Sequence, residues 1–385
     1  MKHVVMGLIL VVTPFAGIAG VTGDVATYGY AQLTAEPISG DQNRNGLAFG
    51  ADRVRLGVRY SDSNWFGAGE LDFNAGDISL QLPGTLPNLV TDLYVGYRMH
   101  PLIQFQLGQF KVPVGMDFSV PGSDLDTVKR GIDRALVLDR SLGIMASGRD
   151  LFGGFGYDLG IFNLAGRSVA TDHTAAQVGD INVIASRVLY DSPARNLHLE
   201  ASLGYSPEAG GQPGTRNYVV ADVGAWVSSG PYSLKGEYIL GQNIRGGLST
   251  PGVDGQNQQV LFLHAGYQWR PKIELIGRVY LASSEQNGVT STLQNTYMGA
   301  NFYLGKNQRH KRLQIQYILA SGDTDQWSGV GGFLSGSLLL QFQIGFEGLS
   351  PGVTKTQASG PCPTTAATPT CAKLPPDDSL SPAPQ

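Results

Sequence analysis

The chain has 385 residues, of which 42% are hydrophobic and 15% charged, with 52 glycines, 16 tyrosines and a formal net charge of −4. This composition excludes a disordered chain, which would lack the hydrophobic residues, and a nucleic-acid-binding protein, which would be strongly basic. The chain is therefore expected to fold, and its partners are not expected to include nucleic acid.

Residues 1–19 have the layout of a secretory signal peptide. One lysine precedes the apolar run Val4–Val12, and small residues follow up to Ala19. The alternative, a membrane anchor, needs about 20 apolar residues, and Thr13 and Pro14 interrupt this run well before that length. We therefore predict export of the protein, with cleavage near Ala19.

The stretch ADRVRLGVRY, residues 51–60, alternates between cationic and apolar side chains. In a strand, successive side chains point to opposite faces, so this segment has one cationic and one apolar face. Like charges two residues apart repel, so the cationic face must be wet, paired with carboxylates, or both. The cationic face consists of Arg53, Arg55 and Arg59, and the apolar face of Val54, Leu56, Val58 and Tyr60.

The same alternation recurs along the chain, for example in IQFQLGQF (103–110) and RLQIQYIL (312–319). Strict alternation over a whole segment is typical of a half-buried strand, and helical periodicity is nearly absent. The predicted strands are residues 25–34, 49–60, 65–74, 89–98, 102–112, 142–148, 153–163, 181–190, 196–205, 218–227, 232–241, 259–269, 272–282, 295–304, 311–319 and 337–346.

The connections between these strands alternate between short ones, such as SDSN, MHP and RPK, and longer ones. Transmembrane barrels have short periplasmic turns and longer outer loops, whereas the alternative, a secreted all-β protein, has no reason to place every short turn at one end. Aromatic residues near strand ends suit the two membrane interfaces. The sequence therefore predicts an all-β fold, a transmembrane antiparallel β-barrel of about 16 strands over residues 24–346.

The end of the chain differs from the rest in composition. Residues 347–385 are rich in Pro, Thr and Ser and lack alternation, so we predict a disordered periplasmic tail. Its two cysteines, Cys362 and Cys371, can form a small disulfide loop under the oxidising conditions that exported chains meet, but this loop would not hold the body together.

Five segments, taken in order, resemble the phosphate-selective porin O and P family of outer-membrane porins. The resemblance implies a barrel that is usually a trimer, in the outer membrane of a Gram-negative bacterium, and a channel whose third long loop folds inward and narrows it. The segments are LGQFKVPVG (107–115), LVLDRSLGIMASG (136–148), GPYSLKGEYI (230–239), IELIGRVY (273–280) and MGANFYLGKNQRHKRLQIQYIL (298–319).

Residues 112–141 form the third long connection and the longest internal one. We expect residues 114–140 to lie inside the barrel. A start signal at Ser123 and apolar residues near helical spacing predict a short amphipathic helix against the wall, although an ordinary helix on an extracellular loop is the alternative. The apolar residues are Leu125, Val128, Ile132 and Leu136.

Arginines that face the lumen would favour anions, because the planar guanidinium holds phosphate through paired hydrogen bonds. In one arrangement Arg53, Arg55 and Arg59 face Arg130 and Arg134 of the third loop across the narrowed waist, and this basic cluster selects anions. In the other, Asp124, Asp126 and Asp133 face the arginines and leave a general, weakly selective porin. The candidate pore-lining and anion-binding residues are Arg53, Arg55, Arg59, Arg98, Arg130 and Arg134, and the opposing acids are Glu70, Asp72, Asp92, Asp124 and Asp126.

The sequence contains no G-x-S-x-G motif, no phosphate-binding loop of the Walker type and no pair of histidines at metal-ligand spacing. We therefore expect a protein that is not an enzyme and that uses no cofactor and no metal. The expected function is passive diffusion of small hydrophilic solutes with a preference for anions such as phosphate, in a homotrimer surrounded by outer-membrane lipid. A plugged barrel with a structural or adhesive role is the alternative from another class.

Overall fold

The computed structural model describes residues 23–38, 46–74, 89–100, 102–163, 182–206, 218–243, 256–305, 310–327 and 332–349. The predicted signal peptide, most of the predicted tail, and Cys362 and Cys371 lie outside the described residues. Within these ranges, no helix has both the length and the apolar character needed to cross a membrane.

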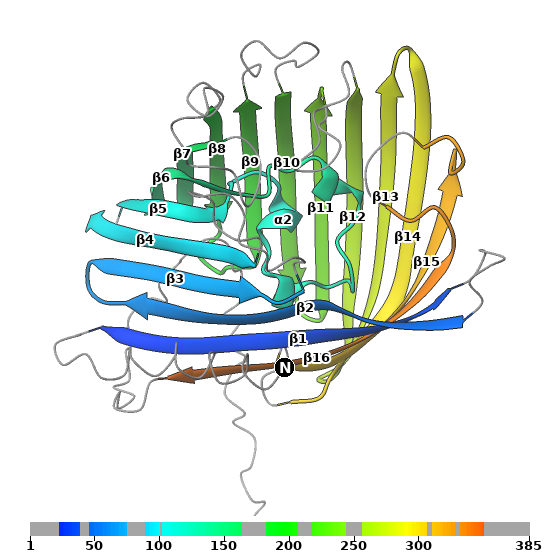
Figure 1. Ribbon diagram of the computed structural model, residues 1–385, viewed down its shortest axis with the longest axis horizontal. Helices are drawn as coiled ribbons and strands as arrows, with labels where there is room; N and C mark the ends of the chain where they lie inside the picture. Colours follow the sequence, from blue (N-terminus) through cyan, green and yellow to red (C-terminus); the bar gives the residue numbers. More distant parts are fainter. Residues whose placement is uncertain are drawn as a thin grey trace, which may run out of the picture.

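Sixteen antiparallel strands form one closed barrel, in which each strand pairs with its neighbours in the sequence and β1 pairs with β16 (Figure 1). This confirms the predicted fold. The strands are β1 (Asp24–Ile38), β2 (Gly46–Ser61), β3 (Trp65–Asp72), β4 (Val90–His100), β5 (Ile103–Lys111), β6 (Arg140–Leu151), β7 (Phe155–Asn163), β8 (Asn182–Asp191), β9 (Leu197–Ser206), β10 (Tyr218–Ser229), β11 (Tyr232–Gln242), β12 (Asn257–Arg270), β13 (Ile273–Gln286), β14 (Val289–Tyr303), β15 (Lys311–Gly322) and β16 (Ser337–Leu349).

The alternation of the sequence places apolar side chains on the outer wall. In β12, for example, Leu263 is 52% exposed, whereas the next residue, His264, points inward and is 3% exposed. The same contrast runs through the other strands, so the outer surface is a broad apolar band. Such a surface is stable against lipid and unstable against water, which makes this a transmembrane barrel.

One connection is shorter than expected. The polar residues around 283–294 were predicted to form a long loop, but β13 and β14 continue to Gln286 and Val289 and are joined by a two-residue turn. Asn287 and Gly288 both have positive φ, 52° and 76°. This conformation suits a tight hairpin turn, and asparagine and glycine are the residues that adopt it most readily.

Loop 3, the segment between Lys111 of β5 and Arg140 of β6, folds into the barrel, as predicted (Figure 1). The predicted amphipathic helix is wrong. Loop 3 contains only three short turns of helix, α2 (Met116–Ser119), η2 (Gly122–Asp124) and η3 (Ile132–Ala135), separated by non-helical chain.

The apolar residues that suggested the helix are nevertheless all buried, at 0–1% exposure. Around Leu125 and Val128 the backbone takes its hydrogen bonds from side chains of the barrel wall, whereas Leu136 N–H donates to the Asp133 carbonyl within the single turn of η3. Gly131 also lies so close to Tyr280 that a Cβ would be 2.0 Å from its ring. The packing of loop 3 against the wall has therefore replaced local helix formation.

The interior contains an apolar core, formed where loop 3 packs against the inner wall. Buried residues of β5–β8 and β10–β16 contribute to this core, for example Phe162, Val220, Phe262 and Tyr280. Among the described residues, β1–β4 contribute no buried member. The space between loop 3 and most of the wall is therefore closed to water, and the side along β1–β4 is not closed in this way.

Candidate functional site

The barrel wall holds the backbone of loop 3 through a set of inward amides that we call the amide ladder. The carbonyl of Asp126 accepts three hydrogen bonds, from Asn301, Gln314 and Gln316, each 3.1 Å long. Gln316 also accepts the N–H of Val128 at 2.8 Å. The amide ladder consists of Gln32, Asn301, Gln314, Gln316, Gln341 and Gln343.

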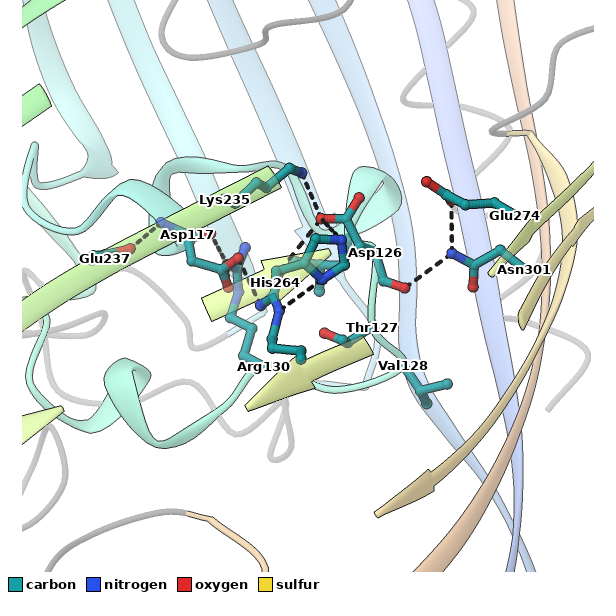
Figure 2. A network of polar contacts seen from close by, with 12 residues as sticks. Asp117, Asp126, Thr127, Val128, Arg130, Lys235, Glu237, His264, Glu274 and Asn301 are labelled. Atoms are coloured by element: carbon teal, nitrogen blue, oxygen red, sulfur yellow. Dashed lines mark hydrogen bonds and ion pairs between the residues drawn. The ribbon is translucent and has the colours of Figure 1, made fainter. Parts of the chain in front are cut away.

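Two acids of loop 3, Asp117 and Asp126, pair with cations on β11 and β13. Figure 2 shows Asp126 beside Lys235 of β11. The Asp126 carboxylate lies 2.5 Å from Lys235 Nζ and 3.4 Å from Arg278. Asp117 lies 2.9 Å from Arg278. On its own, burial would raise the pKa of Asp126, but Lys235, His264 and Arg278 together hold it well below its usual value.

Glu237 of β11 fixes the start of α2. Its carboxylate accepts the N–H groups of Met116 at 3.1 Å and of Asp117 at 2.7 Å. A carboxylate near the first N–H groups of a helical turn satisfies donors that have no partner within the turn. Loop 3 is thus held on this side by both its backbone and its acids.

Asp133 is a different case among the loop 3 acids. It is 1% exposed, and neither of its carboxylate oxygens has a hydrogen-bond partner among the described residues. Burial raises the pKa of Asp133 to about 7, and the nearby charge of Asp117 acts in the same direction. Asp133 therefore adds little negative charge to the interior below neutral pH.

Arg55 of β2 is neutralised by its own neighbours on the wall. Its guanidinium lies 2.8 Å from Glu70 and 2.9 Å from Asp72, both on β3. The three side chains share the inner face, as the alternation predicts. The acids of loop 3 take no part in this group, so Arg55 is neutralised by the barrel wall and not by loop 3.

Arg53 has a neutral partner. Its guanidinium donates to Gln32 Oε1 at 2.7 Å, and no described carboxylate lies within ion-pair distance. It also touches loop 3, because a Cβ added to Gly122 would lie 3.0 Å from Arg53 Cδ. Arg130, Arg55 and Arg134 are close enough to Arg53 for their positive charges to repel its guanidinium.

Two further cations bind backbone carbonyls at the end of α2. Lys111 Nζ donates to the carbonyls of Phe118, Ser119 and Val120 at 2.6, 3.1 and 2.8 Å. Arg130 donates to the carbonyls of Asp117 and Val120, and its guanidinium lies 3.7 Å from the Asp117 carboxylate. Carbonyls are neutral acceptors, so they orient Lys111 without cancelling its charge, whereas the Asp117 carboxylate offsets part of the charge of Arg130.

The most open cation of loop 3 is Arg134, whose side chain is 49% exposed and lies 3.9 Å from Asp139. Lys129 is also partly exposed and pairs with Glu36 of β1 at 3.1 Å. On β6, Arg140 pairs with Asp92 at 2.9 Å. We use the name cationic side for Arg53, Lys111, Lys129, Arg130, Arg134 and Arg140.

Two of the predicted arginines lie away from this group, near the short turns. Arg59 stacks on Tyr28, with its guanidinium 4.0 Å from the ring centre, and lies 3.7 Å from Glu347. Arg98 lies 4.6 Å from the ring centre of Phe66 and donates to the carbonyl of Asp62. The expectation that Arg59 faces loop 3 at the waist is therefore wrong.

The remaining predicted acids are distributed over different groups. Asp92 pairs with Arg140, and Asp126 pairs with Lys235 of β11. Asp124 is the last residue of η2 and is partly exposed.

Sequence reasoning missed three members of the cationic side: Lys129 within loop 3, and Lys111 and Arg140 at its two ends. Lys111 and Arg140 lie at the last position of β5 and the first position of β6, where the alternation pattern fades.

Solved structures with a similar fold are outer-membrane proteins. The outer-membrane channel DcaP of Acinetobacter baumannii has a TM-score of 0.58 at 15% identity, covering 85% of this chain and 99% of that one. An anion-selective porin from Comamonas acidovorans has a TM-score of 0.56 at 16% identity, covering 85% and 100%. The trimer form of OmpT, an outer membrane protein of Vibrio cholerae, has a TM-score of 0.58 at 13% identity, covering 84% and 99%.

These likenesses show that the chain has the porin fold. No family model matches the chain, and no curated protein does. Membership of the phosphate-selective porin O and P family therefore stays a prediction from the sequence segments.

Proposed function

We propose that this chain is an outer-membrane porin, a passive diffusion channel for small hydrophilic solutes that prefers anions such as phosphate. The observation that carries the proposal is the separation of charge around loop 3. Its acids Asp117 and Asp126 are paired with Arg278 and Lys235. On the cationic side, Arg53 and Lys111 bind neutral acceptors, and the other four cations each lie near a carboxylate.

This separation favours anions for a physical reason. The apolar core fills the space between loop 3 and most of the wall, so solutes would pass on the side of β1–β4, where Arg53 lies. A positive group inside a wall of low dielectric constant focuses its field on the passing ion. Guanidinium groups also match phosphate geometrically, because they offer two parallel N–H donors.

The proposed setting is the outer membrane of a Gram-negative bacterium, with lipid around the apolar outer band. We also propose a homotrimer, since one protein with this fold has been solved in a trimer form and the sequence segments resemble a family that is usually trimeric. The described residues contain no group of three or more potential ligands that could hold a metal, and passive diffusion requires neither a metal nor a cofactor.

A plugged barrel is the second candidate, and the apolar core inside the barrel is the observation that favours it. Planar-bilayer recording separates the two. A porin gives stepwise conductance increases on insertion, and an anion-preferring one gives a chloride current that added phosphate reduces. Steps without phosphate block would leave a general porin, and the absence of steps would support the plugged barrel.

A further inference from the structure

A second segment of the chain folds onto loop 3. Residues 332–336, which we call the lead segment, directly precede β16. A Cβ added to Gly332 would lie 2.8 Å from Ile132 of loop 3 and 2.9 Å from Leu293 of β14. The ring of Phe333 packs edge-on against Tyr297, with 6.1 Å between ring centres. The lead segment therefore lies inside the barrel wall and contacts loop 3.

Asn295 of β14 holds the lead segment by binding both backbone polar groups of one residue, Phe333. Its amide donates to the carbonyl of Phe333 at 2.7 Å and accepts the N–H of Phe333 at 2.8 Å. Asn295 is fully buried. If Phe333 moved away, the buried Oδ1 of Asn295 would lose its acceptor bond and its amide N–H₂ would keep only the carbonyl of Gln294, at 3.0 Å. The reciprocal pair therefore fixes the position of Phe333 along the wall.

Gly332 makes the close approach possible. Its φ is +86°, a conformation that residues with a side chain rarely adopt, and the atoms around it leave no room for a Cβ. A larger residue at this position would have to leave both its backbone conformation and its contact with Ile132. The lead segment is therefore seated by two independent features, the glycine and the asparagine.

The seated segment reaches the cationic side. The Phe333 ring centre lies 6.0 Å from Lys129 Nζ, and Lys129 in turn pairs with Glu36 of β1. Phe333 packs against the apolar core, and both Phe333 and Lys129 remain partly exposed. An aromatic ring beside an exposed lysine restricts the approach of solutes to that charge.

We propose that the lead segment is a second constriction element, which narrows the passage beside Lys129 and limits the size of the solutes that reach the cationic side. This inference rests on the proposed channel function. It assigns control of the passage to two loops: loop 3, held by the amide ladder, and the lead segment, held by Asn295.

The test compares three variants of the full-length protein in planar bilayers and in liposome swelling with sugars of increasing size. Asn295→Ala removes both hydrogen bonds to Phe333. Gly332→Val displaces the lead segment in another way, because a side chain at residue 332 would clash with Ile132 and Leu293. Gln258→Ala is the matched control, because Gln258 is an equally buried inward amide whose side chain has no hydrogen-bond partner among the described residues.

Asn295→Ala and Gly332→Val should each raise the single-channel conductance by roughly half or more and admit larger sugars, since pore width sets both quantities. Gln258→Ala should behave like the wild type. Phe333→Ala, which keeps the backbone bonds and removes the ring, should give an intermediate increase. A folded Asn295→Ala and a folded Gly332→Val that both conduct like the wild type would overturn the inference.

The outcome for the wild type keeps this inference distinct from the channel proposal. If the wild type conducts and the variants do not differ from it, only the lead segment proposal fails. If neither the wild type nor any variant conducts, the channel function and the inference both fail. Conductance that appears only in Asn295→Ala and Gly332→Val would contradict an open resting channel and support closure by the lead segment.

Discussion

Loop 3 contacts the barrel on two sides that treat charge in different ways. Toward β11 and β13, the acids Asp117 and Asp126 lie within ion-pair distance of Arg278 and Lys235. Toward β2 and β5, Arg53 binds an amide and Lys111 binds three carbonyls. Neutral acceptors satisfy the donors without cancelling the charge. A protein of net charge −4 can therefore present a positive field at one place.

Removing a cation that pairs with the loop 3 acids Asp117 and Asp126 should have the largest effect on stability. Arg278→Met leaves the carboxylates of Asp117 and Asp126 without a shared partner in a buried site, which should cost about 3–5 kcal/mol. The free energy of unfolding can be measured by urea titration in lipid vesicles, using tryptophan fluorescence. Arg278→Lys keeps the charge and should lose less. Equal stability of Arg278→Met and the wild type would show that the two sides do not differ.

Removing a cation that binds backbone carbonyls should have a smaller effect on stability. Lys111→Met leaves the carbonyls of Phe118, Ser119 and Val120 short of a donor but strands no charge, which should cost about 1–3 kcal/mol. The same urea titration gives the value. The single-channel current of Lys111→Met should also be noisier, because the end of α2 is no longer held by hydrogen bonds from Lys111. A loss as large as that of Arg278→Met would mean that Lys111 also balances buried carboxylates.

Asp133 should make the stability of the folded protein depend on pH. Its pKa is raised from 3.8 to about 7 in the folded protein, so the folded state binds the proton more tightly than the unfolded chain. Stability should therefore be highest below pH 4 for this group and fall as the pH rises towards 7, by about 1–2 kcal/mol between pH 5 and pH 8 after allowance for relaxation of the site.

Asp133→Asn is the variant that isolates this contribution. The fall in unfolding temperature between pH 5 and pH 8 should be smaller in Asp133→Asn than in the wild type, because the variant has no proton to lose. An identical fall in both proteins would assign the pH dependence to other groups.

Removing one residue of the amide ladder should have the smallest effect on stability. Gln316→Ala removes one of the three donors to the Asp126 carbonyl and the acceptor of the Val128 N–H, which should cost about 1 kcal/mol. Gln314 and Asn301 keep the carbonyl satisfied. Urea titration should therefore show a small shift and bilayer recording little change in selectivity. A shift as large as that of Arg278→Met would show that the ladder, and not the ion pairs, holds loop 3.

The strands could be predicted because their signal is local. Alternation in segments such as residues 51–60 and 312–319 fixes which side chains face inward, and sixteen strands follow. The extension of β13 and β14 could not be predicted in this way, because the polar residues near Thr292 do not alternate with apolar ones. There the tight turn at Asn287 and Gly288 carried the signal.

The candidate site depended on contacts between distant parts of the chain. Apolar spacing correctly indicated that Leu125 and Ile132 are buried, but the backbone between them is held by wall residues such as Gln314 and Gln316, far away in the sequence. Alternation could place Arg55 inside the barrel. It could not show that Asp126 would pair with Lys235, or that Arg53 and Lys111 would bind neutral acceptors.

The most direct test of the account is the zero-current potential across a bilayer that separates two KCl concentrations. We predict that the wild type prefers chloride and that Arg53→Gln/Arg134→Gln, which removes two charges from the cationic side, loses most of this preference. Lys235→Gln/Asp126→Asn removes an ion pair with no change in net charge and should keep it. A wild type that prefers potassium, or a potential unchanged in Arg53→Gln/Arg134→Gln, would contradict the account.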